Sequence, residues 1–258
     1  MPRTFLATLQ YDGTDFVGWQ RQREGRTVQQ EIEAVLARLA GHMVRVHAAG
    51  RTDTGVHALG LGVSFTLPDR WTPSALLRAM NALVPRDCFV VRVVEARAGF
   101  HARTAATGRR YRYLIGTDPM ARSPFRRPHE WALGTPLDGA RLDQAAARIQ
   151  GSHDFKAFSV ARSFRPHTRC LIRTARWERR PCEQGLSFEI AADRFLHHMV
   201  RMLVGTMVEI AQDRRPDADL DRLLARDPGY RTSPPAPPEG LYFVAACYPD
   251  EWFLPPTD

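Results

Sequence analysis

The order in which strand-like and helix-like patterns follow one another constrains this chain most strongly. Residues 4–11 alternate in polarity as a half-buried strand does, with one apolar face made by Phe5, Ala7, Leu9 and Tyr11. Residues 27–41 carry apolar side chains at helical spacing, between a Thr/Gln capping box and a terminal glycine. Strands are predicted at 43–48, 57–66 and 88–94, with a helix that starts at Pro73. This β-α-β-β-α-β order is ferredoxin-like.

The second half of the chain repeats this order. We predict two helices and four strands, at residues 110–116, 138–150, 169–179, 185–192, 195–212 and 241–247, of which 138–150 and 195–212 are the helices. The predicted fold class is therefore α+β, with two tandem ferredoxin-like halves at 1–106 and 107–258 and an active cleft between side-by-side sheets. The proline-rich segment 233–238 is expected to form an ordered or semi-rigid loop.

The charge distribution indicates a polyanionic partner. The chain of 258 residues has a formal net charge of +8, and Lys156 is its single lysine among 36 basic residues. Residues 101–130 hold seven arginines against two acids, and residues 161–180 hold seven against one. Such clusters are typical of nucleic-acid binding, although a solvated surface in an arginine-rich protein remains the alternative. We expect charge reversal at Arg126 and Arg127 to weaken RNA binding without harming the fold.

Several classes of protein are excluded by what the sequence lacks. No apolar run approaches the roughly 20 residues of a membrane span, and the first residues lack a signal-peptide core, so a cytoplasmic protein is expected. The four cysteines are far apart and form no Cys-x-x-Cys pair, which excludes a zinc ribbon and a thioredoxin-type motif. Glycine-rich phosphate-binding motifs are also missing, so no nucleotide cofactor is expected.

The densest candidate for chemistry is the segment Gly50–His57. Its two glycines allow a turn and a close substrate approach, while Asp53 is suited to act as a nucleophile or base near a phosphate-binding Arg51. The alternative is a tight polar turn in which the aspartate caps the backbone. Residues 53–55 also match the aspartic-protease tripeptide, but that chemistry needs a second copy, and the sequence contains only one.

Three other groups of residues are candidates. In the segment Arg109–Tyr113, alternation places the two tyrosines on one strand face and Arg110 and Arg112 on the other, so Tyr111 could stack on an extruded base, or the strand could simply be half-buried. Arg201 lies in an apolar helical pattern, where it either reaches solvent or pairs with an acid such as Asp53. A metal site at His197-His198, with His153-Asp154, is disfavoured because adjacent helical histidines diverge.

Five segments in order resemble the tRNA pseudouridine synthase A family, and the resemblance covers nearly the whole chain. They are an opening signature, a catalytic loop, a base-stacking strand, a late helix and a last strand, at Tyr11–Gln22, Gly50–His57, Arg109–Tyr113, Phe195–Arg201 and Gly240–Val244. The resemblance implies the pseudouridine synthase fold, an α+β fold whose mixed, mainly antiparallel sheet carries helices and a central basic cleft. Thr54 stands where alanine is common in relatives.

The resemblance also implies an activity, the conversion of uridine to pseudouridine at positions 38, 39 and 40 in the anticodon arm of tRNA. It implies a homodimer that needs no metal or cofactor. Asp53 corresponds to the nucleophile, with Arg201 as its salt-bridge partner and Arg51 as the group that helps to extrude the base. Tyr111 corresponds to the residue that stacks on the target base, Leu241 to an apolar wall of the base pocket, and the neighbouring Arg109 and Arg110 are expected to hold phosphates.

The chemistry leaves some alternatives open. Asp53 could attack the ribose, attack the base or abstract a sugar proton. A non-catalytic RNA-binding module would keep the basic surface without turnover, but the presence of Asp53, Tyr111 and Arg201 together disfavours it. A zinc-dependent base deaminase also flips bases, yet its His/Cys-x-Glu and Pro-Cys-x-x-Cys patterns are absent from the sequence.

Overall fold

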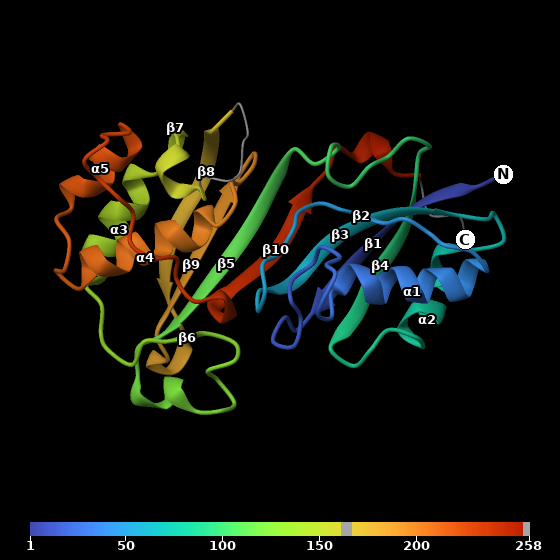
Figure 1. Ribbon diagram of the computed structural model, residues 1–258, viewed down its shortest axis with the longest axis horizontal. Coiled ribbons are helices and arrows are strands. Elements are labelled where there is room, and N and C mark those ends of the chain that lie inside the picture. The colour runs from blue at the N-terminus through green and yellow to red at the C-terminus, as the bar shows by residue number, and fades with distance from the viewer. Residues whose placement is uncertain (161–166, 255–258) are drawn as a thin grey trace. The chain divides into compact units, whose positions relative to one another are not determined.

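A computed structural model describes residues 1–160 and 167–254, which divide into two compact units. One unit combines Met1–Thr107 with the C-terminal segment from Phe243, and the other is Gly108–Tyr242. Figure 1 shows the ribbon coloured along the chain. Each unit contains a β-sheet with helices, which confirms the α+β class. The assignment of evolutionary halves to 1–106 and 107–258 stays a prediction.

The first unit has the predicted β-α-β-β-α-β order. Its elements are β1 (Arg3–Tyr11), α1 (Val28–Ala40), β2 (His47–Ala48), β3 (His57–Leu67), α2 (Pro73–Asn81) and β4 (Cys88–Ala96). In the sheet, β1 lies between β4 and β3 and is antiparallel to both, and β2 pairs with β3. β10 (Leu241–Cys247) neighbours β3, so the end of the chain completes the sheet of the first unit.

The ends of both helices follow the expected capping chemistry. Thr27 and Gln30 form the predicted capping box of α1, and Gly41 ends the helix in the left-handed conformation at a φ of 81°. Thr72 caps α2 with its side chain, and Pro73 occupies the first helical turn. These local signals explain why the bounds of α1 and the start of α2 could be predicted closely.

The second unit repeats the alternation with additions. Its elements are β5 (Gly108–Gly116), β6 (Trp131–Ala132), α3 (Gly139–Arg148), β7 (Gly151–Asp154), β8 (Arg169–Arg179), β9 (Leu186–Ala192), α4 (Met199–Ala211) and α5 (Ala218–Leu224). The strands lie in the order β5-β9-β8-β7 with antiparallel pairing, while β6 pairs parallel to β5. The helix α3 contacts α4, α5 and β8, which buries its apolar side.

Two predicted elements were wrong in extent. Of residues 43–48, only His47 and Ala48 form a strand, because the Val46 N–H donates to the Glu33 carboxylate (3.4 Å) instead of to a neighbouring strand. The helix predicted at 195–212 begins only at Met199, because His198 takes a positive φ of 63°. The short elements β6, β7 and α5 were not predicted, since each is too short to show a periodicity.

Among residues 1–160 and 167–254, no helix is both long enough and apolar enough to cross a membrane.

Candidate functional site

Asp53 lies in the loop between β2 and β3, in the first unit. Its side chain is half-buried, while Arg51 is exposed and Thr52 is 7% exposed. The Val56 N–H donates to the Asp53 carbonyl at 3.2 Å, which closes a tight turn around Gly55, whose φ is 76°. Main-chain bonds therefore set the turn, and they fix the place from which the carboxylate leaves the backbone.

The Asp53 loop is held by the opening segment of the chain. The Trp19 N–H donates to the Thr52 carbonyl at 3.1 Å, and the Gly55 N–H donates to the Phe16 carbonyl at 3.3 Å. The buried hydroxyls of Tyr11 and Thr52 are 2.8 Å apart and share a hydrogen bond. Together these bonds anchor the residues on both sides of Asp53 to residues 33 to 41 positions earlier.

Two glycines of the opening segment allow this close packing. A β-carbon on Gly18 would lie 2.7 Å from the Thr52 carbonyl oxygen, and Gly18 also has a φ of +97°. A β-carbon on Gly13 would lie 2.2 Å from the Val56 carbonyl oxygen, and the Gly13 N–H donates to Nδ1 of the buried His57 at 3.0 Å. The sequence showed these glycines as part of a signature, but their contact with the Asp53 loop was not predicted.

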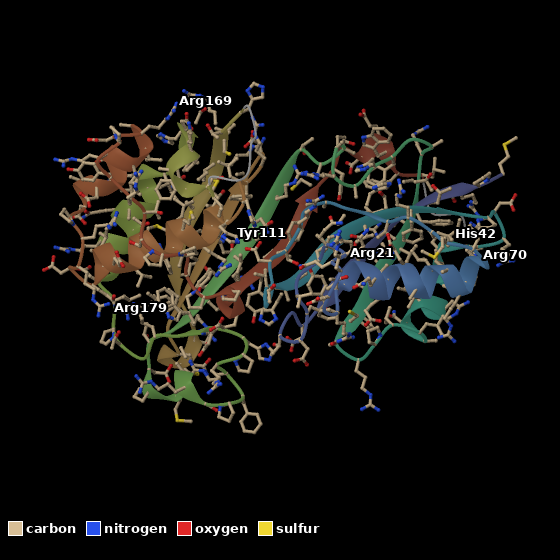
Figure 2. The ribbon with its side chains drawn as sticks, in the orientation of Figure 1. Arg21, His42, Arg70, Tyr111, Arg169 and Arg179 are labelled. Carbon is tan, nitrogen blue, oxygen red and sulfur yellow. The ribbon has the colours of Figure 1, made fainter. Side chains whose placement is uncertain are left out.

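Tyr111 lies on β5 in the second unit (Figure 2), paired in register with Ile190 of β9. It is 9% exposed, and its ring meets the Phe195 ring edge-on with centroids 5.0 Å apart. Tyr113, on the same strand face, is fully buried and donates to the Pro237 carbonyl at 2.7 Å. Burial raises the pKa of Tyr113 well above its usual range, so this hydroxyl stays protonated as a structural donor.

The two faces of β5 use their arginines differently. Arg109, on the tyrosine face, donates to the Asp193 carbonyl at 3.0 Å. On the opposite face, Arg112 forms an ion pair with Glu189, with 2.6 Å between Arg112 Nη2 and Glu189 Oε1, and Arg110 is exposed. Arg110 is thus the more accessible of the two arginines predicted to hold phosphates.

Arg201, in the first turn of α4, holds the proline-rich loop. Its Nε donates to the Ala236 carbonyl at 2.7 Å, and the Ala236 N–H donates back to the Arg201 carbonyl at 3.0 Å. The loop leads through Gly240, whose added β-carbon would lie 2.6 Å from the Tyr113 ring, to the buried Leu241. The predicted ordered loop is confirmed, and it links the α4 arginine to β5 and Leu241.

The structure thus groups the predicted residues into two sets, each within one unit. Arg51 and Asp53 share a loop of the first unit. Tyr111, Arg109, Arg110, Arg201 and Leu241 belong to the second unit, where the proline-rich loop connects several of them. The roles of these residues, and the pairing of Arg201 with Asp53, stay predictions.

Many clustered arginines already have protein partners. Arg126 forms two bonds with the Asp118 carboxylate, at 2.9 and 2.8 Å, and one with the Glu130 carboxylate at 2.8 Å. Glu130 is buried and also binds Arg180. These contacts argue against the expectation that Arg126 reversal would leave the fold intact, because the side chain connects Asp118 to Glu130 within the loop 118–130. Arg162 and Arg165 of the second cluster lie outside the described residues.

We expect Arg126→Glu to destabilise the second unit by about 1–3 kcal/mol, since it removes one of the two arginines that pair with the buried Glu130 and places a like charge beside Asp118. Arg127→Glu carries the same charge change at the neighbouring exposed position, and it should alter the free energy of unfolding by less than about 0.5 kcal/mol. Urea unfolding of both variants measures the difference. Equal stabilities would show that the Arg126 network does not hold the loop.

Comparison with known proteins adds independent support. The sequence matches the family described as tRNA pseudouridine synthase over residues 7–103 and 145–249. The chain belongs to the tRNA pseudouridine synthase family. Membership makes it an isomerase that acts on tRNA uridines, and it confirms the resemblance noted from the five sequence segments.

Individual relatives align over almost their full length. The tRNA pseudouridine synthase A of Myxococcus xanthus is 41% identical over 250 residues, which cover 97% of this chain and 93% of the relative. The protein of the same name from Geobacillus kaustophilus is 39% identical, and the alignment covers 97% of this chain and 96% of the relative. The one from Methylococcus capsulatus is 38% identical, and the alignment covers 95% of this chain and 90% of the relative. The two family-matched regions contain both the Asp53 loop and Arg201, and they leave out Tyr111.

Proposed function

We propose that this chain isomerises uridine to pseudouridine at positions 38, 39 and 40 in the anticodon stem-loop of tRNA, with Asp53 as the nucleophile. In this reaction the C1′–N1 glycosidic bond breaks, the uracil turns, and a C1′–C5 bond forms. The C5 hydrogen leaves as a proton, and N1 gains one. A homodimer in the cytoplasm, with no metal or cofactor, completes the proposal.

The single observation that best supports the proposal is the way in which the Asp53 loop is held. Its hydrogen bonds come from the main chain and from Tyr11, and two glycines bring the opening segment into contact with it. A half-buried carboxylate on a fixed turn is pre-positioned for reaction, which lowers the entropic part of the barrier. A turn that only connects two strands has no need of such anchoring.

The second unit supplies features that suit the handling of an extruded base. Tyr111 is supported edge-on by Phe195, and the exposed Arg110 is on the opposite face of the same strand. A uridine inside a stem must leave the base stack before C5 can reach the ribose, at a cost of a few kcal/mol. Phosphate contacts from exposed arginines and stacking on Tyr111 would offset this cost.

The direct test is tritium release from tRNA labelled at C5 of uridine. We expect release at the rate of pseudouridine formation, with the modified positions mapped to the anticodon arm. A non-catalytic RNA-binding module would bind the same tRNA and release no tritium. Modification confined to sites outside positions 38–40 would contradict the proposed specificity while leaving the isomerase class intact.

Substitution of Tyr111 tests its proposed stacking role. Tyr111→Phe keeps the aromatic ring and should retain tRNA affinity, whereas Tyr111→Ala should lose stacking worth about 1–3 kcal/mol per base. Stopped-flow fluorescence of tRNA carrying a fluorescent base near position 39, together with single-turnover rates, measures both effects. Should the Ala variant match the wild type in both, Tyr111 would be only a core residue of β5.

A further inference from the structure

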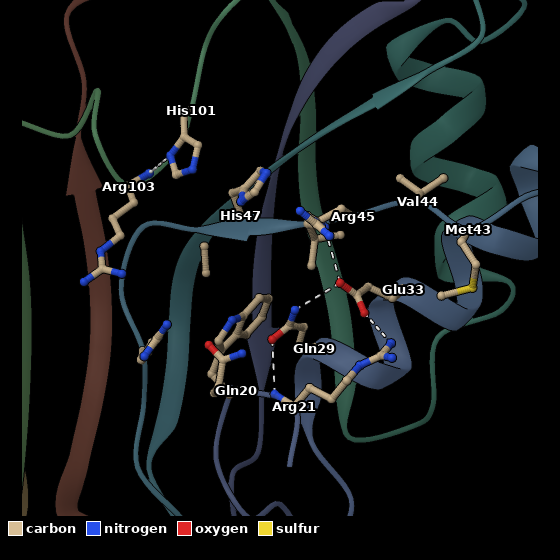
Figure 3. A pocket seen from close by; sticks show the side chains of 14 residues that line it. Gln20, Arg21, Gln29, Glu33, Met43, Val44, Arg45, His47, His101 and Arg103 are labelled. Carbon is tan, nitrogen blue, oxygen red and sulfur yellow. Dashed lines mark hydrogen bonds and ion pairs between the residues drawn. The ribbon is translucent and has the colours of Figure 1, made fainter. Parts of the chain in front are cut away.

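A cavity of about 610 Å³ lies in the first unit (Figure 3). Arg51 is one of the residues that line it. Four further segments line it: residues 19–21, α1 at Gln29 and Glu33, residues 43–48, and His101 with Arg103. All of them belong to the first unit. Because Arg51 is two residues from Asp53, this cavity adjoins the loop that carries the proposed nucleophile.

One wall of the cavity is closed by a hydrogen-bond network. The buried Glu33 carboxylate accepts from Arg21 Nη2 at 2.5 Å, from Gln29 Nε2 at 3.0 Å and from the Val46 N–H at 3.4 Å. The amide oxygen of Gln29 in turn accepts from the Arg21 N–H at 3.1 Å. These groups form hydrogen bonds with one another, so they shape the wall and have little hydrogen-bonding capacity left for a ligand.

The other walls present groups that the protein does not use. Within residues 1–160 and 167–254, the exposed guanidinium groups of Arg45 and Arg51 form no ion pair with an acid, and the side-chain amide of Gln20 has no hydrogen-bond partner. A guanidinium group presents a planar fork of donors that suits phosphate, and a free amide can recognise a base edge. The cavity therefore combines two anion-binding groups with one polar group suited to a base.

A stacked pair of imidazoles adds a flat surface. The centroids of the His47 and His101 rings lie 4.3 Å apart, and the angle between the two ring planes is 31°. Both side chains are half-buried in the cavity wall (Figure 3). Burial lowers the pKa of His47, and the charges of His101 and Arg45 lower it further, so the ring is neutral near pH 7. Stacked imidazole rings offer the type of aromatic face on which unpaired RNA bases stack.

We propose that this cavity binds one nucleotide of the tRNA chain that flanks the target uridine, with its phosphates on Arg45 and Arg51 and its base against the His47–His101 pair. This inference rests on the proposed function, and it adds a substrate subsite to that function. The volume falls in the range of small-molecule pockets and is sufficient for a nucleotide. An RNA chain is favoured over a free nucleotide because Arg51 belongs both to the cavity and to the Asp53 loop.

The test compares Arg45→Gln with Arg92→Gln, which removes the same charge from an exposed position on β4 that does not line the cavity. For Arg45→Gln we expect KM for tRNA to rise about tenfold with kcat unchanged. The slope of log affinity against log salt should become shallower by about 0.7, the value for one phosphate contact on a single strand. Arg92→Gln should leave KM and kcat as in the wild type. Equal KM values for the two variants would overturn the subsite.

A histidine titration by NMR gives a readout that does not need turnover. The charged and titratable groups lining the cavity around His47 are Arg21, Glu33, Arg45, Arg51, His101 and Arg103. The nearby cations lower the pKa of His47, and the negative charge of a bound phosphate opposes that effect. An anticodon-arm RNA should therefore raise the pKa of His47. Arg45→Gln should raise it in the free protein, because one of the lowering charges is removed.

The outcomes separate this inference from the proposed function. If the wild type modifies tRNA and the RNA leaves the pKa of His47 unchanged, the subsite is wrong and the function stands. If RNA raises that pKa and Arg45→Gln weakens RNA binding, but no tritium is released, the subsite stands and the catalytic proposal is wrong. If uridine 5′-monophosphate shifts the pKa while the RNA does not, the cavity serves a free nucleotide and the inference is overturned.

Discussion

Asp53→Asn should abolish pseudouridine formation while the protein stays folded and binds tRNA with near-normal affinity. Asparagine keeps the size of the side chain and much of its hydrogen bonding, but it provides no anionic nucleophile or base. The main-chain bonds that define the turn, from Val56 to Asp53 and from Trp19 to Thr52, do not involve this carboxylate. The turn should therefore survive the substitution, so that any loss of turnover reports on chemistry.

The alternative role for Asp53, a capping residue in a polar turn, predicts the opposite result. Asparagine and aspartate cap comparably, so a structural aspartate would tolerate the change and the enzyme would stay active. Pseudouridine should be quantified by mass spectrometry of digested tRNA, with circular dichroism and a binding isotherm as controls on the fold. Formation within tenfold of the wild-type rate would refute the nucleophile role.

Gly18→Ala should cause the largest loss of both stability and turnover among substitutions outside the reacting groups. The added β-carbon would lie 2.7 Å from the Thr52 carbonyl oxygen and 3.2 Å from the Asp53 carbonyl carbon, so the Asp53 loop must move. Overpacking costs about 1–3 kcal/mol, and the positive φ of Gly18 adds about 1–2 kcal/mol for a residue with a side chain. A displacement near 1 Å in the Asp53 loop would lower the rate of the chemical step by about a hundredfold.

Gly41→Ala provides the matched control for Gly18→Ala. Gly41 also has a positive φ, +81° against +97°, but a β-carbon there would meet no atom within 4 Å. The Gly41→Ala variant should lose about 1–2 kcal/mol of unfolding free energy because of the backbone conformation alone, and it should keep full turnover. Thermal unfolding and single-turnover kinetics of both variants measure the difference. If both lose the same stability and neither loses turnover, the contact between Gly18 and the Asp53 loop is not what positions Asp53.

Local chemistry explains how much could be predicted from the sequence. The capping box at Thr27, the terminal Gly41 and Pro73 in the first turn of α2 are signals that act within a few residues, and the structure agrees with each. The alternating strands were found for the same reason, since one buried face imposes a period of two. Local periodicity was also enough to predict the α+β class and the repeated β-α-β-β-α-β order.

Where local signals were outweighed by distant contacts, prediction failed. The strand expected at 43–48 is shortened because the Val46 N–H binds the Glu33 side chain of α1, a partner that strand periodicity does not reveal. Arg126 looked like a surface cation within a basic cluster, yet it forms ion pairs with Asp118 and the buried Glu130. Sequence clustering counts charges, but only the folded chain shows which of them have partners.

The sequence by itself determined the family, the order of the elements and the residues that are candidates for catalysis, because these depend on residue identity and local spacing. Tertiary structure alone decided how the Asp53 loop is held, since its anchors at Tyr11, Phe16 and Trp19 are 33 to 41 residues from the groups they bind. It also decided that Arg45 lines a cavity with Arg51. Contacts between distant segments form only when hydrophobic burial brings the segments together, and no local pattern encodes them.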